Sequence, residues 1–352
     1  MLVYLGLLLL ILILTLVCNE FIKDNKLKAK IITGISLLAI YLLYVLKDYS
    51  IGSDTDAYFN TYEQMKNVPF GDFETIYMEE GYQCLMQLCI LAKMEFRGFL
   101  LVAYAISIIP LYFFITKFSK NASLSIIIYI CYQFLVFSMS GIRQTIATGM
   151  CLTAYLMLES KIKWKHFWFL LLVLVGYTFH QSAIVFIFVP LIKKIPFTKG
   201  TLILFLSVFA FIFIFRTQIS TYLAKLTGYR GSFTLGLNYI LVLFIVVFSI
   251  LVFLLTNNTN EKKKPDDSYK WFKFSFYALM LHTALYTTVL LRAASLLTIF
   301  FLLLIPSLLE KFDNKSRKVL TTLINFALVI FFITTVLVPN QLEIAHYKFF
   351  WQ

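Results

Sequence analysis

Five of the six arginines lie at or near the ends of long apolar segments, where a charged side chain is unusual. They are Arg97, Arg143, Arg216, Arg230 and Arg292. The guanidinium group is planar, stays charged and donates paired hydrogen bonds, which suits it to bind phosphate. A single arginine of this kind could simply extend its side chain to the membrane surface. Five of them together favour recognition of an anionic substrate.

One histidine, His180 in the segment GYTFHQSA, is the first candidate for proton transfer. Its neutral imidazole could accept a proton from a sugar hydroxyl near neutral pH. A lone histidine in an apolar segment can equally be a hydrogen-bonded core residue, and this alternative stays open. Carboxylates could do the same work, and the candidates are Asp54, Asp56 and Glu80.

Residues 48–80 form the longest hydrophilic segment, with eight acidic residues, one lysine and many aromatic residues. Aromatic faces stack on sugar rings and carboxylates bind sugar hydroxyls, so this composition suits a carbohydrate. An ordinary solvated loop would look similar, and both interpretations are kept. Gln144 and Ser182, close in sequence to Arg143 and His180, add amide and hydroxyl groups that could bind phosphate or sugar.

These polar residues must be held by a strongly apolar chain, in which 60% of the residues are hydrophobic and 14% are charged. Soluble domains carry about 25% charged residues. Unbroken apolar segments in lipid must satisfy their own backbone hydrogen bonds, so each is predicted to be a helix, and a transmembrane β-barrel is excluded. The sequence therefore predicts an all-α polytopic membrane protein. It excludes a soluble enzyme or a nucleic-acid-binding protein, despite the net charge of +13.

Apolar segments separated by charged residues predict about twelve transmembrane helices in one integral membrane domain, residues 1–352. The predicted spans are 2–18, 31–47, 97–116, 122–140, 143–159, 167–179, 182–192, 201–216, 237–256, 272–289, 293–309 and 319–338. Lysine clusters flank residues 167–192 on both sides, so two half-helices meeting near His180 keep both clusters on the cytoplasmic side. This topology places 20 of the 25 lysines inside and the five arginines outside.

Three connecting segments complete the predicted organisation. Residues 81–94 are too short to span, and we expect an amphipathic or re-entrant helix that makes residues 48–96 an external loop plus helix covering the site. Residues 217–236 form a second external loop, whose glycines could let backbone N–H groups approach a phosphate. Residues 257–271 form a cytoplasmic loop. No Walker, GxSxG or HExxH motif occurs in the chain.

Several short motifs resemble the EpsG/Wzy family of bacterial polysaccharide polymerases. They are GSDTDAYFNTY at 52–62, EEGYQCL at 79–85, SGIRQTIATG at 140–149, HQSA at 180–183, LRAAS at 291–295 and a closing Tyr347. Such proteins join lipid-linked oligosaccharide repeat units into capsule, exopolysaccharide or O-antigen. The resemblance implies a GT-C-like glycosyltransferase in the bacterial cytoplasmic membrane. Its substrate would be an undecaprenyl-pyrophosphate-linked oligosaccharide, bound at the outer face.

The resemblance also implies roles for the residues in these motifs. Arg143 and Arg292 would stabilise the leaving pyrophosphate in a poorly hydrated site, so that no metal ion or other cofactor is required. His180 would orient or deprotonate the acceptor hydroxyl, which attacks the anomeric carbon with inversion. The residues expected to bind substrate are Asp54, Asp56, Glu80, Tyr82, Arg97, Gln144, Ser182, Arg216 and Arg230. The lipid bilayer is an expected partner, and a chain-length regulator is left open as another.

Two other functions fit parts of the same pattern. An O-antigen ligase uses the same chemistry, but a larger outer domain between late helices would be expected. A flippase or other transporter of lipid-linked oligosaccharide would need charged residues along a path through the membrane and often internal repeats. The sequence contains no such repeat, and its outer charges gather at one face.

Overall fold

The computed structural model describes residues 1–132, 134–195, 267–284 and 291–352, with scattered positions between 203 and 225. Across these residues the regular structure is helical, and the only β-pairing is an isolated antiparallel bridge between Lys47 and Phe349. The chain forms two compact units, residues 1–183 with 312–352 and residues 184–311.

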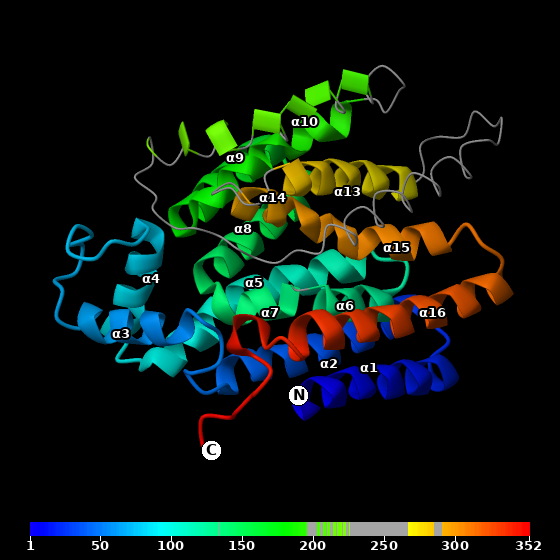
Figure 1. Cartoon of the computed structure of the whole chain (residues 1–352), viewed down its shortest axis with the longest axis horizontal. Helices are drawn as coiled ribbons and strands as arrows, with labels where there is room; N and C mark the ends of the chain where they lie inside the picture. The colour runs from blue at the N-terminus through cyan, green and yellow to red at the C-terminus, as the bar shows by residue number, and fades with distance from the viewer. Residues whose placement is uncertain are drawn as a thin grey trace. The chain divides into compact units, whose positions relative to one another are not determined.

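The first unit contains most of the long helices among the described residues (Figure 1). Its helices are α1 (Leu2–Phe21), α2 (Asn25–Leu46), α3 (Thr55–Met65), α4 (Glu80–Leu91), α5 (Phe96–Phe118), α6 (Ala122–Cys131), α7 (Phe134–Ser140), α8 (Ile142–Leu158), α9 (Lys165–Phe179), α16 (Asn314–Phe332), η3 (Ile333–Leu337) and η4 (Gln341–Glu343). The short helix η1 (Gln181–Phe188) follows α9 and continues into the second unit.

Four of these helices are long and apolar enough to cross a membrane: α1, α2, α5 and the continuous stretch Asn314–Leu337. The pair α6 and α7, bent by 53°, is a fifth candidate. These five match the spans predicted at 2–18, 31–47, 97–116, 319–338 and 122–140. The described residues thus show four or five apolar spans. Among the other predicted spans, 167–179 and 293–309 correspond to shorter apolar helices, Lys165–Phe179 and Ser295–Leu309, and the described parts of 143–159, 182–192 and 272–289 do not form helices that are long and apolar enough to cross. The predicted spans 201–216 and 237–256 lie mostly outside the described residues.

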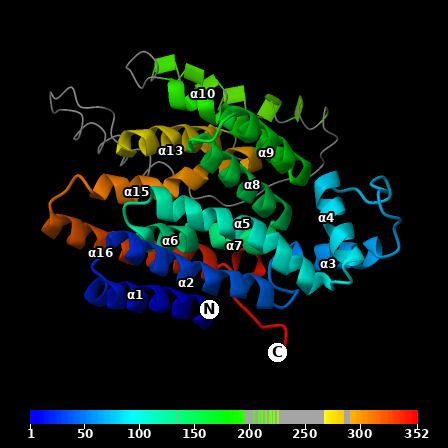
Figure 2. The same ribbon diagram turned by 180° about the vertical axis from the view of Figure 1, so that it is seen from behind.

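Helix α8 is at the centre of the first unit, because it packs against both α5 and α9. Helix α2 packs against α1 and α5, and α16 packs against α6, as the two views in Figures 1 and 2 agree. Small residues allow the closest of these approaches. A Cβ atom added to Gly149 of α8 would lie 2.4 Å from the carbonyl oxygen of Ile106 and 2.6 Å from the Cα of Ser107, both in α5.

We expect Gly149→Ala to destabilise the first unit, because backbone atoms of α5 cannot move aside as a flexible side chain could. The expected loss is about 1–3 kcal/mol of unfolding free energy. Gly6→Ala is the matched control, since nothing lies within 4 Å of a Cβ at that position. Thermal unfolding of both variants in detergent tests the prediction, and equal melting temperatures would contradict it.

One helix of the first unit was missed by the sequence analysis, which treated residues 48–80 as a loop. Helix α3 lies within this segment. Its buried residues Tyr58, Tyr62 and Met65 recur at a helical spacing, but the polar residues between them hide the pattern. Tyr62 packs against Phe96 and Phe99 of α5, with ring centroids 5.6 Å apart in both cases. Residues 48–80 are therefore packed on α5 through aromatic side chains.

The second unit contains α10 (Val189–Lys194), α13 (Asp267–Ala284), α14 (Leu291–Leu297), η2 (Thr298–Phe300) and α15 (Phe301–Leu309). Its core is aromatic: Trp271 and Phe274 of α13 stack on Phe300, with ring centroids 6.1 Å and 4.5 Å apart. The buried ammonium of Lys273 donates hydrogen bonds to the carbonyls of Lys193 (3.0 Å) and Ile195 (2.7 Å), which links α13 to the end of α10.

Candidate active site

Arg143 lies in the first turn of α8, directly after the short break that separates α8 from helix α7. Helix α7 ends at Ser140, and Gly141 is the N-cap of α8 but has no side chain to cap it. The amino end of a helix carries a partial positive charge. Arg143 therefore adds its guanidinium charge to an end that already favours anions.

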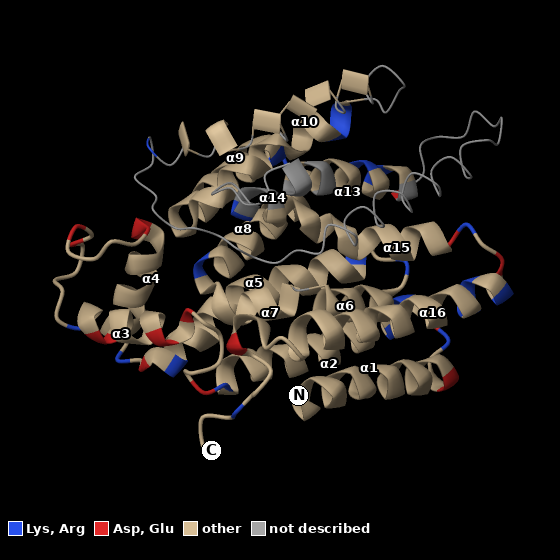
Figure 3. Cartoon of the chain, viewed as in Figure 1, with Lys and Arg blue, Asp and Glu red and all other residues tan. Residues whose placement is uncertain are grey.

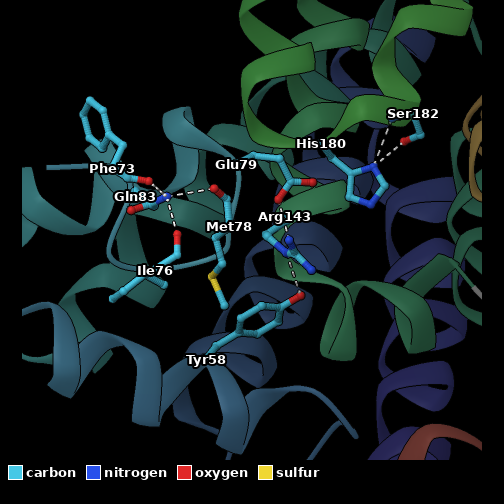
Figure 4. A network of polar contacts seen from close by, with 9 residues as sticks. All are labelled: Tyr58, Phe73, Ile76, Met78, Glu79, Gln83, Arg143, His180 and Ser182. Carbon is cyan, nitrogen blue, oxygen red and sulfur yellow. Dashed lines mark hydrogen bonds and ion pairs between the residues drawn. The ribbon is translucent and has the colours of Figure 1, made fainter. Parts of the chain in front are cut away.

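The guanidinium group of Arg143 is held by two residues from the segment 48–80. Its NH1 forms an ion pair with Glu79, and its Nε donates a hydrogen bond to the hydroxyl of Tyr58 at 3.3 Å (Figure 4). The guanidinium carbon also lies 5.7 Å from the centre of the Tyr58 ring. The side chains of Arg143 and Glu79 are only 23% and 16% exposed. The pair is therefore poorly hydrated but still reachable from solvent.

Two glutamines of α4 hold the loop that carries Glu79. The buried Gln83 donates through Nε2 toward the carbonyls of Phe73, Ile76 and Met78, at 2.8–3.1 Å (Figure 4). One helical turn later, Gln87 binds the same loop at both ends of its amide: Nε2 donates to the carbonyl of Pro69 and Oε1 accepts from the N–H of Gly71. These contacts order the chain that leads to Glu79, the N-cap residue of α4.

His180 ends α9, and the chain turns back after it. A Cβ atom on Gly176 would lie 3.4 Å from that of Ala183, which a continuous helix would place far apart. The predicted break near His180 is thus confirmed. The same Cβ would lie 3.5 Å from the carbonyl oxygen of Ala147 on α8. Helices α8 and α9 are antiparallel neighbours. His180 is one turn after Gly176 and Arg143 is one turn before Ala147, so both residues lie at the same end of the helix pair (Figure 4).

The hydrogen bonds of His180 indicate the tautomer of its neutral ring. Its Nδ1 accepts a hydrogen bond from the backbone N–H of Ser182 at 3.2 Å and lies 2.7 Å from the Ser182 hydroxyl. A nitrogen that accepts from an N–H carries no proton, so the neutral ring has its proton on Nε2. In this form Nε2 of His180 is a hydrogen-bond donor.

Helix α4 reaches this level through a close contact with α9. A Cβ on Gly81 would lie 2.3 Å from the hydroxyl and 2.8 Å from the carbonyl oxygen of Thr178, so glycine is needed there. The contact places Glu79, two residues before Gly81, next to the turn that begins at His180. Arg143, Glu79, Tyr58 and His180 therefore form one polar cluster from four elements.

Ser53 and Asp54 contact the end of α7, just before the break between α7 and α8. The Ser53 hydroxyl lies 2.8 Å from that of Ser140, and the N–H of Asp54 donates to the same Ser140 oxygen at 3.3 Å. Lys47 lies next to the same residues and is completely buried. Its ammonium donates to the carbonyl of Ile51 (3.0 Å), to the hydroxyl of Thr55 (2.7 Å) and to the carbonyl of Met139.

Arg97 has structural partners. Its NH1 donates to the carbonyls of Val45 and Lys47, and its guanidinium carbon lies 3.9 Å from the centre of the Phe350 ring. The C-terminal segment that carries Phe350 is tied to the end of α2, because the Tyr347 hydroxyl donates to the carbonyl of Leu43 at 2.7 Å. Arg97 thus joins α5, the end of α2 and the C-terminus.

The remaining predicted site residues occupy varied places. Glu80 and Asp56 are exposed, and Asp56 accepts a hydrogen bond from Asn60. Tyr82 is buried, its ring 5.5 Å from that of Tyr58, and its hydroxyl has no hydrogen-bond partner among the described residues. Gln144 is buried in α8. Arg292 lies on α14 in the second unit, and Arg216 and Arg230 lie outside the described residues.

Three residues in or next to the cluster were not singled out from the sequence: Glu79, Tyr58 and the nearby Lys47. Glu79 and Glu80 are adjacent and equally acidic, and only the winding of α4 decides which of them faces Arg143. Tyr58 could have been found from its position one helical turn after Asp54, had α3 been predicted. Nothing in the sequence around Lys47 distinguishes it from other lysines at helix ends.

Charge is also distributed unevenly along the helices of the first unit. Acidic residues gather around α3 and α4, whereas lysines lie at the start of α16, at the opposite end of the long helices (Figure 3). Among the described residues, no group of three or more histidine, cysteine or acidic side chains is placed to hold a metal ion.

The apolar helices and the half-buried polar cluster define a multi-pass helical membrane protein. The model of the EpsG family matches residues 35–349 of the chain, and the protein belongs to this family. Membership supports a role of the polysaccharide-polymerase type, with glycosyltransferase chemistry, in broad terms. No curated protein and no solved structure gives a significant match.

Proposed function

We propose that the protein is a polysaccharide polymerase that joins undecaprenyl-pyrophosphate-linked oligosaccharide repeat units. The observation that carries this proposal is the Arg143 cluster, a half-buried guanidinium at the amino end of α8. When the glycosidic bond of the donor breaks, negative charge develops on the pyrophosphate. A fixed guanidinium and a helix amino end in a poorly hydrated site stabilise such charge. The reaction then proceeds with inversion and without a metal ion.

The proposal places this cluster on the outer face of the bacterial cytoplasmic membrane, in a GT-C-like arrangement of about twelve spans. The separation of acidic residues from lysines along the first unit supports this orientation, because cytoplasmic ends of membrane helices are enriched in lysine. Arg292, together with Arg216 and Arg230, belongs to the same proposal as a further phosphate-binding group. Asp54, Asp56, Glu80, Tyr82, Gln144 and Ser182 are proposed to bind the sugars.

The test uses the purified protein in detergent with lipid-linked repeat units, and without nucleotide sugar, metal ion or ATP. A ladder of products separated by size would support a polymerase. Unchanged substrate size, combined with movement of the substrate across a liposome bilayer, would instead show a transporter. Transfer to a lipid-A acceptor without a ladder would show a ligase.

His180 is proposed to orient the acceptor hydroxyl, as its Nε2–H form allows. We expect His180→Ala to slow turnover about tenfold to a hundredfold and to weaken donor binding much less, because the imidazole acts on the acceptor. Single-turnover rates and donor affinity, measured on the same preparation, separate the two effects. An unchanged rate would remove His180 from the reaction.

A further inference from the structure

The partner of Arg143 suggests which group accepts the proton of the attacking hydroxyl. The only ion pair that the described residues make with Arg143 is the one with Glu79. A pyrophosphate that binds the guanidinium must displace this carboxylate or share Arg143 with it, because both are anions that use the same N–H donors. Binding of the donor therefore releases Glu79 from its pair at the place where the reaction occurs.

A released carboxylate in this position is suited to accept a proton. Glu79 is held by an ordered loop, through Gln83 and Gln87, so it does not move far from the site. It lies beside the α9 turn that holds His180. The imidazole of His180 has its Nδ1 engaged by the N–H of Ser182 and its proton on Nε2, so it presents a donor. The cluster thus contains one proton acceptor, and it is the carboxylate.

We propose that Glu79 is the general base of the transfer reaction, held inactive by Arg143 until the donor pyrophosphate takes its place. This inference rests on the proposed function. The acceptor hydroxyl oxygen forms a bond to the anomeric carbon while the bond from that carbon to the phosphate oxygen breaks. The proton of the hydroxyl goes to Glu79, and the electron pair of the broken bond goes to the leaving polyprenyl pyrophosphate, which Arg143 binds. The carboxylic acid then returns its proton to water.

The other carboxylates of the segment are less well placed for this step. Glu80 is exposed, and Asp56 is exposed and bound to Asn60. Asp54 packs with Ser53 over the chain break before α8. Among the described acidic residues, Glu79 alone is in contact with Arg143, so it alone changes partner when a phosphate arrives.

The deciding experiment compares Glu79→Gln with wild type in two assays. Glutamine keeps the size of the side chain and can still bind Arg143, but it cannot take up a proton. Binding of undecaprenyl pyrophosphate in detergent is expected to be equal or tighter, since no carboxylate competes for the guanidinium. The single-turnover rate of glycosyl transfer is expected to fall about 100-fold or more. Glu74→Gln, an exposed carboxylate of the same external segment, is the control and should change neither value.

Each other outcome overturns the inference. An unchanged rate in Glu79→Gln shows that Glu79 is not the base. If binding and rate fall together, the ion pair has only a structural role. Should the glutamine variant fail to fold, Glu79→Asp replaces it: a shorter carboxylate should retain binding and give an intermediate rate, and a wild-type rate would count against the proposal. If the wild-type protein makes no polymer, the proposed function itself is rejected. This result is distinct from the outcomes for the Glu79 variants, which test only the general base.

Discussion

Arg143→Lys is expected to reduce polymer formation by about 100-fold or more while leaving the amount of protein in the membrane unchanged. Lysine keeps the positive charge but replaces a planar group with five donors by a single ammonium. In the structure the guanidinium of Arg143 binds Glu79 through NH1 and Tyr58 through Nε. These two contacts fix the orientation of its plane. A single ammonium cannot keep the contact with Tyr58 and also offer a pyrophosphate the planar, paired donors of a guanidinium.

The matched control for this variant is Arg317→Lys. Arg317 lies at the start of α16, where its NH2 donates to the carbonyl of Phe312 at 3.2 Å, and the proposed orientation would place it on the cytoplasmic side, away from the Arg143 cluster. Its substitution should leave the product ladder unchanged. The measurement is the rate of ladder formation per mole of purified protein. Wild-type activity of Arg143→Lys would place the phosphate-binding group elsewhere.

The second large effect is expected at Lys47, the buried lysine that joins three parts of the site. Its Nζ lies within hydrogen-bond distance of the carbonyl of Ile51, the hydroxyl of Thr55 and the carbonyl of Met139. Lys47→Met would leave these acceptors without a buried donor, which costs about 3 kcal/mol of unfolding free energy. The loop that carries Asp54 would then lose its link to the end of α7, which precedes Arg143. We therefore also expect activity to fall at least tenfold.

Lys47 also predicts a pH dependence of stability. Burial lowers the pKa of its ammonium to about 7, whereas the charge of Asp54 acts in the opposite direction. In the unfolded chain the group has its ordinary pKa of 10.5. Between pH 7 and 10.5 the unfolded chain therefore binds a proton that the folded protein has released. The contribution of Lys47 to stability rises with pH in this window, by at most about 1.4 kcal/mol per pH unit.

Thermal unfolding of wild type and Lys47→Met in detergent at pH 7, 8 and 9 tests both expectations. The melting temperature of the wild type should exceed that of the variant, and the difference should grow as the pH rises. Lys66→Met is the control: this exposed lysine pairs with Glu63 and Glu95 at the surface, so its loss should leave the melting temperature nearly unchanged. A constant difference between wild type and Lys47→Met would show that Lys47 does not titrate in this range.

The amino-acid sequence alone was sufficient for the class of protein and for much of the framework. Long apolar segments predict helices because a backbone in lipid has no other way to satisfy its hydrogen bonds, and five predicted spans agree with the described helices. The break at His180 was also predicted, because lysines on both sides of residues 167–192 cannot both be cytoplasmic on a single span. The motif resemblance to the EpsG family is confirmed by the family match.

Pairing between distant residues was decided only by the tertiary structure. Composition cannot show that Glu79, rather than Glu80, faces Arg143, because this depends on where α4 begins: Glu79 is its N-cap residue with an extended backbone, whereas Glu80 is already helical. Nor can it show that Lys47 contacts the carbonyl of Met139 at the end of α7, 92 residues away. Hydrophobic patterning acts along one segment at a time, whereas an active site depends on which faces of different helices meet. Here those meetings depend on the packing of α3, α4, α8 and α9 around one half-buried arginine.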